Sequence, residues 1–201
     1  MSESFYAPAD PGRRRVAFGL CGSFCTLDKG VAAAEQLVRL GWEVLPVMSW
    51  NAAALDTRFG RAADWKLRLY QATGHEVIET LQGAEPLGPK GMADAMVIAP
   101  CTGATLARLD LGLSDTPVTL GAKSLLRGHR PVVIAVSTND GLGASARHIA
   151  ALLGRKDYYF VPFGQDDCLK KPMSLKADFS LLPETLEQAM HGRQFQPVLL
   201  S

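Results

Sequence analysis

The chain has 201 residues, of which 47% are hydrophobic and 20% are charged, and its formal net charge is +1. This composition is typical of a soluble globular domain with a substantial core. The near-neutral charge provides no overall field for binding nucleic acid or a membrane surface, and no apolar run approaches the ~20 residues of a membrane span. We therefore expect a cytoplasmic protein whose partners are neither nucleic acids nor membranes.

The domain organisation that the composition predicts is simple. The first residues contain prolines, acids and small residues but no apolar stretch of signal-peptide length, so we expect residues 1–14 to form a flexible tail. Residues 15–201 contain no internal repeat and no low-complexity linker, which predicts a single domain.

The cysteines and histidines show no metal-binding pattern. The four cysteines are Cys21, Cys25, Cys101 and Cys168, and the four histidines are His75, His129, His148 and His191. No CxxC pair and no HxxxH spacing occurs, so we expect free thiols in a reducing compartment and no metal site.

Apolar runs and helical spacing alternate along the chain. The predicted strands are Arg15–Leu20, Trp42–Met48, Ala95–Ala99, Pro131–Val136 and Tyr158–Pro162. The predicted helices are Leu27–Leu40, Asp64–Gln82 with a bend or a break at Gly74, Thr105–Leu111, Asp115–Arg127, Ala144–Leu153 and Pro183–Met190. Pro46 indicates that the second strand is either bulged or near an edge of the sheet, and the Gly and Pro content of Gly83–Gly91 predicts a loop. The alternation predicts a Rossmann-like or flavodoxin-like α/β fold, doubly wound, with a mainly parallel sheet and helices on both faces.

Four polar loops follow predicted strands. They are Gly19–Thr26, Ser49–Asn51, Cys101–Thr105 and Ser137–Gly141. In a parallel sheet all four lie at one edge, where such folds bind ligands, and their hydroxyl and amide groups suit a polar or phosphorylated ligand. Each loop taken alone is equally consistent with an ordinary tight turn.

The first loop differs from a dinucleotide fingerprint. It reads GLCGSF rather than GxGxxG, and no acidic residue ends the second strand. A Gly22-Ser23 turn before a helix suits one phosphate, held by backbone N–H groups and the Ser23 hydroxyl, which favours a mononucleotide. The alternative is a plain turn in which Ser23 caps the following helix.

A family resemblance extends this interpretation. The segment APCTGATLARL is similar to the proline-to-threonine flavin motif of the homo-oligomeric flavin-containing Cys decarboxylase superfamily. Several segments, taken in order, resemble the family of dipicolinate synthase B subunits within that superfamily. They are GLCGSFCT (19–26), DTRFG (56–60), GHEVIETL (74–81), AEPLGPK (84–90), APCTGATLARL (99–109), SDTPVTLGAKSLLRG (114–128), PVVIAVSTNDGLG (131–143), YYFVPFGQDD (158–167) and KKPMSLKADF (170–179).

The resemblance implies a flavodoxin-like fold and an FMN site at the contacts between protomers of trimer-based homo-oligomers. The residues that match its cofactor positions are Gly22, Ser23, Ser49, Pro100, Thr102, Gly103, Thr105, Ser137, Thr138 and Asn139. Ala104 stands where the motif has Asn, so one amide contact, worth roughly 0.5–1.5 kcal/mol, is missing and FMN binding is weakened.

The implied function is oxidation of dihydrodipicolinate to dipicolinate for sporulation, in the cytoplasm of a spore-forming bacterium. The implied partner is the dehydrogenase-like A subunit of dipicolinate synthase, through which alone NAD(P) would enter. The small dicarboxylate substrate calls for cations, and the candidates are Arg108, Lys123, Lys170 and Lys171, each of which also reads as an ordinary surface charge.

His75 is the candidate catalytic residue. In a helix it has Glu79 at i+4, and a paired imidazole can act as an acid or a base; a packing role is the alternative. Three other functions stay open: a stand-alone flavin-dependent decarboxylase, a non-catalytic subunit that stabilises its dehydrogenase-like partner, and a generic nucleotide-binding module.

Overall fold

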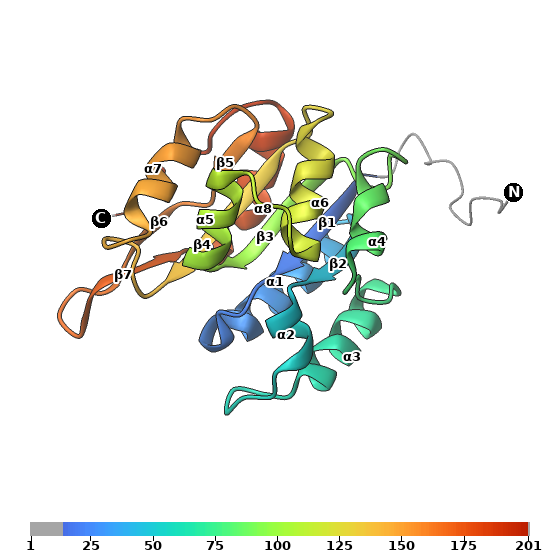
Figure 1. Ribbon diagram of the computed structural model, residues 1–201, viewed down its shortest axis with the longest axis horizontal. Helices are drawn as coiled ribbons and strands as arrows, with labels where there is room; N and C mark the ends of the chain where they lie inside the picture. Colours follow the sequence, from blue (N-terminus) through green and yellow to red (C-terminus); the bar gives the residue numbers. More distant parts are fainter. Residues whose placement is uncertain (1–13, 201) are drawn as a thin grey trace, which may run out of the picture.

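The computed structural model describes residues 14–200, which build a seven-stranded sheet (Figure 1). The strands are β1 (Arg15–Leu20), β2 (Glu43–Met48), β3 (Ala95–Cys101), β4 (Val132–Thr138), β5 (Tyr158–Phe160), β6 (Phe163–Asp167) and β7 (Lys171–Ala177). Their order is β2-β1-β3-β4-β7-β6, and β5 also pairs with β4. Strands β1 to β5 are parallel, whereas β6 and β7 form an antiparallel hairpin.

Helices cover both faces of the sheet (Figure 1). They are α1 (Leu27–Arg39), α2 (Trp50–Ala54), α3 (Ala62–Thr73), α4 (Leu81–Ala84), α5 (Gly103–Leu111), α6 (Pro117–Leu126), α7 (Ala146–Leu153) and α8 (Leu182–Met190), with short 3-10 turns η1 (Phe24–Thr26), η2 (Glu85–Leu87) and η3 (Phe179–Leu181). Because the crossovers from β1 to β2 and from β3 to β4 run in opposite directions, right-handed connections place α1 and α6 on opposite faces. The predicted fold class is confirmed.

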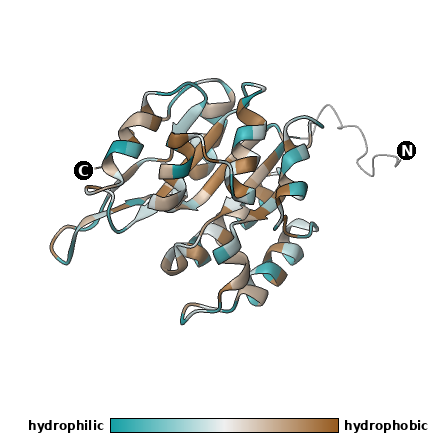
Figure 2. Ribbon diagram, in the orientation of Figure 1, coloured by the Kyte–Doolittle hydropathy of each residue, from teal (hydrophilic) through white to brown (hydrophobic). Residues whose placement is uncertain are grey.

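The core is built around β3, which is buried along its whole length. Figure 2 shows hydrophobic residues concentrated in the central strands. Phe18, Met96, Ile98 and Ile134 are fully buried there, as expected for parallel strands covered on both faces. The register between β3 and β4 shifts between Ile98 and Cys101, where Pro100 has no N–H to donate to the ladder.

Most predicted elements are present, and Pro46 does lie on an edge strand, β2. The helix predicted over Asp64–Gln82 is wrong in its second half. It ends at Thr73 because Gly74 takes a left-handed conformation (φ 73°), and the chain then runs outside β2, where Ile78 bridges Val47. The predicted loop Gly83–Gly91 contains the end of α4 and all of η2.

The hairpin of β6 and β7 is absent from the prediction, which ended the sheet with Tyr158–Pro162. Its two strands, FGQDD and KPMSLKA, are mostly exposed or half-buried and so carry no apolar run. Of the predicted tail, residues 1–13 lie outside the described residues. Arg14 is held by an ion pair with Glu187 and lies 4.7 Å above the Trp42 ring centroid. No helix between residues 14 and 200 is long and apolar enough to cross a bilayer.

Replacing Gly30 by Ala should destabilise the fold. A Cβ at Gly30 would lie 2.5 Å from the Ala99 carbonyl oxygen and 2.8 Å from Pro100 Cδ, so α1 would have to move away from β3. We expect a loss of about 1–3 kcal/mol in the free energy of unfolding, measured by urea denaturation. Gly154→Ala is the matched control, since its Cβ would meet no atom closer than 3.8 Å. Equal stability of the two variants would contradict this packing.

Candidate functional site

Three of the polar loops meet at the carboxyl edge of the sheet and line a cavity of about 560 Å³. This volume is within the range of ~300–1,000 Å³ for small-molecule and cofactor sites. The loop between α2 and α3 and the hairpin of β6 and β7 supply the remaining walls. Six of the predicted cofactor residues line it: Gly22, Ser23, Thr102, Ser137, Thr138 and Asn139.

A ring of three hydroxyl groups joins the loops after β1 and β4. Ser137 Oγ lies 2.9 Å from both Ser23 Oγ and Thr26 Oγ1, and Thr26 Oγ1 lies 3.0 Å from Ser23 Oγ. Thr26 and Ser137 are buried, whereas Ser23 is partly open to the cavity. Thr26 Oγ1 also lies 3.0 Å from the Ser23 carbonyl oxygen, so its one proton is shared between that carbonyl and Ser23 Oγ. Around the ring each hydroxyl can donate one proton and accept one, which leaves each oxygen a lone pair for a further partner.

The phosphate turn differs from the prediction at its backbone. The Ser23 N–H donates to the Cys21 carbonyl at 2.8 Å, so it does not point freely at a ligand. Nor does the Ser23 side chain cap a helix, because it is used in the hydroxyl ring. What Ser23 offers to the cavity is its hydroxyl group.

Of the proline-to-threonine segment, only Thr102 lines the cavity. Thr102 caps α5 by accepting from the Thr105 N–H, and the two threonine hydroxyls lie 3.0 Å apart. Thr105 Oγ1 donates to Cys21 Sγ at 3.3 Å, and the Cys21 N–H donates to the Pro100 carbonyl at 3.2 Å. Pro100 and Thr105 are not among the residues that line the cavity; through Cys21 they connect the end of β3 and the start of α5 to the loop after β1.

Asp140 organises the loop after β4. Its Oδ1 accepts hydrogen bonds from the hydroxyls of Thr138 and Ser145. The bond from Thr138, more than that from Ser145, lowers the pKa of this carboxyl below its usual value, so it is ionised at neutral pH. Gly103 packs against this group, and a Cβ there would overlap the Ser145 hydroxyl oxygen. The structure therefore uses Gly103 for close packing beside the cavity.

Ser49 lies beside the cavity without lining it. It precedes α2, and its N–H donates to the Leu20 carbonyl at 3.0 Å. The neighbouring Asn51 Cβ is 3.5 Å from where a Cβ on Gly22 would lie, so the loops after β1 and β2 are in contact.

Of the four predicted substrate cations, only Lys171 lines the cavity. It pairs with Asp166 at 2.8 Å, while Lys170 is exposed outside the cavity. Lys171 first, and then Lys176, lowers the pKa of Asp166 to about 2. Arg108 and Lys123 instead line a separate cavity of about 350 Å³ beside α5 and α6, where Arg108 pairs with Asp115.

His75 is not where the prediction placed it. It follows the end of α3, and its Nε2 lies 3.3 Å from Glu43 Oε1 at the start of β2. Glu79 pairs with Lys66 instead of His75. Because β2 is parallel to β1, its first residue is at the opposite edge of the sheet from the cavity. The helical geometry behind the predicted acid–base role is therefore absent.

Some residues of the cavity were missed. Arg58 and Phe59 come from the DTRFG segment, and Asp166 and Lys176 come from the hairpin. All four residues lie in segments that stand out only through the family resemblance (56–60, 158–167 and 170–179), and the hairpin strands lack an apolar signal.

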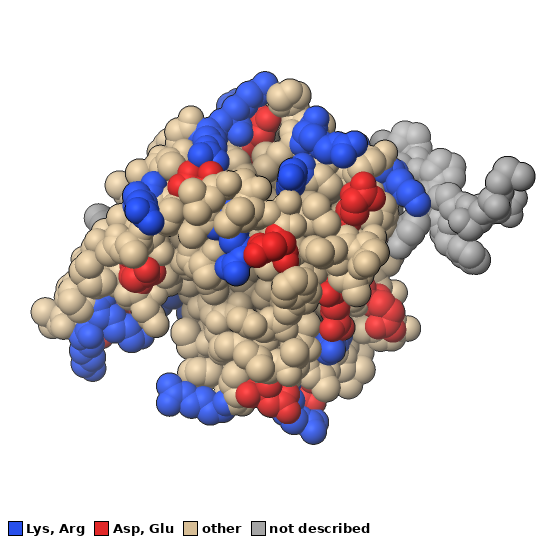
Figure 3. All heavy atoms as spheres, viewed as in Figure 1, with Lys and Arg blue, Asp and Glu red and all other residues tan. Residues whose placement is uncertain are grey.

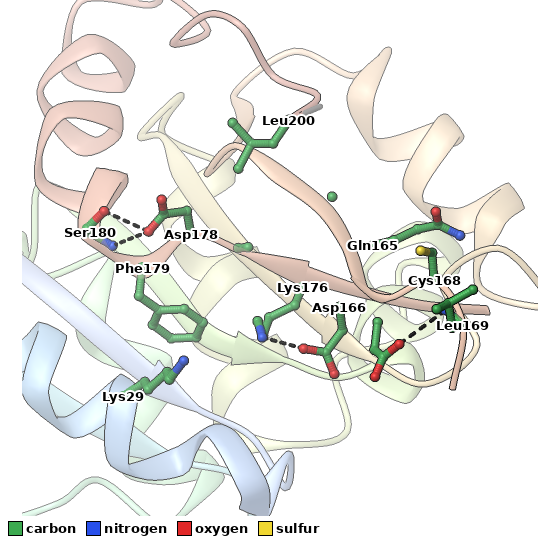
Figure 4. A pocket seen from close by; sticks show the side chains of 13 residues that line it. Lys29, Gln165, Asp166, Cys168, Leu169, Lys176, Asp178, Phe179, Ser180 and Leu200 are labelled. Carbon is green, nitrogen blue, oxygen red and sulfur yellow. Dashed lines mark hydrogen bonds and ion pairs between the residues drawn. The ribbon is translucent and has the colours of Figure 1, made fainter. Parts of the chain in front are cut away.

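A second and larger hollow adjoins the first (Figure 4). Its volume is about 950 Å³, and it shares Asp166 and Lys176 with the first cavity. In Figure 4, Lys176 of β7 points at Asp166 of β6, and Lys29 of α1 lies beside Phe179. This ion pair therefore lies between the two hollows.

The wider surface and the thiols add two observations. On the face drawn in Figure 3, basic and acidic side chains are interspersed. No group of three metal-ligating side chains occurs among residues 14–200. Burial raises the pKa of the Cys21 thiol to about 11 and that of Cys101 well above its usual value, whereas Cys25 and Cys168 are exposed.

Comparison with known proteins places the chain in a class. The model of the Flavoprotein family matches residues 6–149. The B subunit of dipicolinate synthase from Bacillus subtilis (strain 168) is 44% identical over 187 residues, which cover 93% of this chain and 94% of that protein. The crystal structure of the dipicolinate synthase B subunit from Bacillus halodurans C is 42% identical, with a TM-score of 0.86 and coverage of 94% and 96%.

A more distant structure is that of the FMN-dependent cysteine decarboxylase SpaF, with a TM-score of 0.64, 25% identity and coverage of 88% of this chain and 97% of that one. The chain therefore belongs to the Flavoprotein family and, within it, to the family of dipicolinate synthase B subunits. The resemblance of the quoted segments is confirmed, and the family supports flavin binding.

Thiol labelling should separate the four cysteines into two pairs. At pH 8 we expect iodoacetamide to modify Cys25 and Cys168 and to spare Cys21 and Cys101, because the second pair is buried and protonated. Peptide mass spectrometry before and after labelling measures this, with urea-unfolded protein as the control in which all four react. Rapid labelling of Cys21 in folded protein would contradict the structure of the loop after β1.

Proposed function

We propose that the chain is the FMN-type flavoprotein component of dipicolinate synthase and acts with the dehydrogenase-like A subunit of that enzyme to oxidise dihydrodipicolinate to dipicolinate. The observation that carries this proposal is the likeness to dipicolinate synthase B subunits over almost the whole length of both chains. NAD(P) would enter through the dehydrogenase-like partner only. The setting would be the cytoplasm of a spore-forming bacterium, where the product serves sporulation.

The cavity at the carboxyl edge fits FMN in size and in the character of its polar groups. Ser23 would hold the phosphate by turning its hydroxyl proton out of the ring, while Ser137 and Thr26 keep the remaining bond of 2.9 Å. Thr138 gives its proton to Asp140 and accepts from the Asp140 N–H at 3.5 Å, so its remaining lone pair would accept from a ligand N–H. Ala104 supplies no amide at the start of α5, so we expect modest affinity.

When bound, FMN would supply a hydride acceptor for the dihydro ring, whose aromatisation favours the reaction. The chain's own residues would bind and orient. Ionised Asp140 fixes the direction of the Thr138 and Ser145 hydroxyls, and the ring of Ser23, Thr26 and Ser137 fixes the opposite wall. Side chains held this way lose little freedom when a ligand binds, which favours precise placement.

The assembly remains a proposal. We expect a trimer-based homo-oligomer, with residues 15–201 as one domain, that associates with the dehydrogenase-like partner. A stand-alone decarboxylase is less well supported, because no histidine is among the residues that line the cavity and His75 lies at the opposite sheet edge.

FMN should bind and shield one thiol selectively. Cys25 lines the candidate site, whereas Cys168 lies in the hairpin and borders the second hollow. We expect FMN at tens of micromolar to give a perturbed visible spectrum and to slow alkylation of Cys25 but not of Cys168. Ser23→Ala should weaken FMN binding roughly two- to tenfold, the loss of one hydrogen bond. No FMN binding, or equal protection of both thiols, would remove the flavin site.

Turnover should require both proteins of the pair. The purified dehydrogenase-like partner and this chain, mixed with FMN, with NAD(P)⁺ as the final hydride acceptor and with dihydrodipicolinate, should form dipicolinate, followed by its ultraviolet absorbance, and neither protein should do so alone. Thr138→Val, which removes the acceptor hydroxyl at nearly constant volume, should lower the rate of the mixture. Full turnover by the partner without this chain, whose addition then only increases the partner's stability, would establish the non-catalytic alternative.

A further inference from the structure

We infer that Arg58 and Lys171 form a two-point clamp for a dicarboxylate at the mouth of the cavity. This inference rests on the proposed function, because it names the residues that would hold the substrate of that reaction. Arg58 comes from the loop between α2 and α3, Lys171 comes from the start of β7, and both line the cavity. Two cations on separate segments suit an anion with two charged ends.

The turn that carries Arg58 is ordered. Thr57 and Gly60 exchange two backbone hydrogen bonds, of 3.0 and 3.1 Å, and the Phe59 N–H donates to Thr57 Oγ1 at 3.1 Å. Gly60 (φ 144°) lies against the Trp65 ring, where a Cβ would be 2.5 Å from Cζ2. Arg58 and Phe59 are therefore the two central residues of a tight turn, and their side chains point away from its backbone.

The Arg58 guanidinium is available to an anion. Its only side-chain contact of a polar or aromatic kind within residues 14–200 is with the Phe59 ring, whose centroid lies 4.8 Å from Cζ, and no carboxylate in that range pairs with it. Stacking on an aromatic face restrains the guanidinium plane and leaves its N–H edge free. A planar fork of N–H donors matches a carboxylate in bidentate geometry.

Lys171 can be released at low electrostatic cost. Asp166 accepts from Lys171 at 2.8 Å and also pairs with Lys176. If the Lys171 ammonium turns to a ligand, Asp166 keeps a partner and is not left as an uncompensated charge. With three cations (Arg58, Lys171, Lys176) and two carboxylates (Asp140, Asp166) on its walls, the cavity has a net positive lining.

The test measures the affinities of Arg58→Gln and Lys171→Gln by calorimetry, with Arg61→Gln as the control. Arg61 lies three residues from Arg58, pairs with Asp64 and does not line the cavity. The probes are pyridine-2,6-dicarboxylate and pyridine-2-carboxylate, each with FMN-loaded and flavin-free protein, and FMN and riboflavin themselves. Thermal melting of each variant checks that it is folded.

We expect each clamp variant to bind the dicarboxylate roughly tenfold or more weakly, to lose most of the preference for two carboxylates over one, and to bind FMN like the parent chain. A weaker affinity of Arg58→Gln for FMN but not for riboflavin would overturn the inference and assign Arg58 to the phosphate. An unchanged dicarboxylate affinity in either variant, or no dicarboxylate binding by the parent chain, would also overturn it. A failure of FMN binding would be seen separately and would count against the proposed function alone.

Discussion

Parallel pairing of β1, β3 and β4 is the constraint on which the site depends. Parallel strands end at the same edge of a sheet, so the loops that follow β1, β3 and β4 all lie at that edge. β3 is buried along its whole length, and Pro100 near its end is covered by α1 and bonded to the loop after β1. The polar side chains of these turns meet because the apolar strands beneath them pair in register.

Burial of those polar groups requires that they bond to one another. A buried hydroxyl without a partner is destabilising by about 1–3 kcal/mol, whereas a hydrogen bond between two such groups contributes about 0.5–1.5 kcal/mol of stability. The ring of Ser23, Thr26 and Ser137 and the pair of hydroxyls on Asp140 meet this requirement without a ligand. What the networks add is position, because each hydroxyl oxygen is held in place before anything binds, while the Ser23 proton can still turn toward a ligand.

The remaining walls of the cavity come from segments that are not part of the parallel strands or of the loops that follow them. β5 pairs only with the first half of β4, from Val132 to Ile134, and leaves the outer edge of Ser137 and Thr138 open. β7 takes that edge in antiparallel pairing, which carries Lys171 and Asp166 to the rim of the site. A tight turn between α2 and α3 brings Arg58 to the same rim. The basic side chains of the site therefore come from the hairpin and from the turn between α2 and α3, whereas the loops after β1, β3 and β4 supply its hydroxyl groups.

The sequence by itself determined the parallel sheet, its helices and the loops that form the floor of the site. Continuous apolar runs such as PVVIAV, and helical spacing between them, are local patterns, and an unbroken order of strand and helix leaves few ways to fold. The resemblance to a known family was also evident from the sequence alone, because the motifs and their order along the chain are properties of the sequence.

Only the tertiary structure decided which polar residues meet. Arg108 and Lys123 line another cavity. His75 lies at the far edge of the sheet because, of the bend or break expected at Gly74, the structure has the break, and the helix ends at Thr73. Arg58 and the hairpin came to the site through contacts between segments distant in the chain. The sequence determines which functional groups are available. A site also requires that these groups lie close together, and this depends on packing and strand pairing across the whole fold.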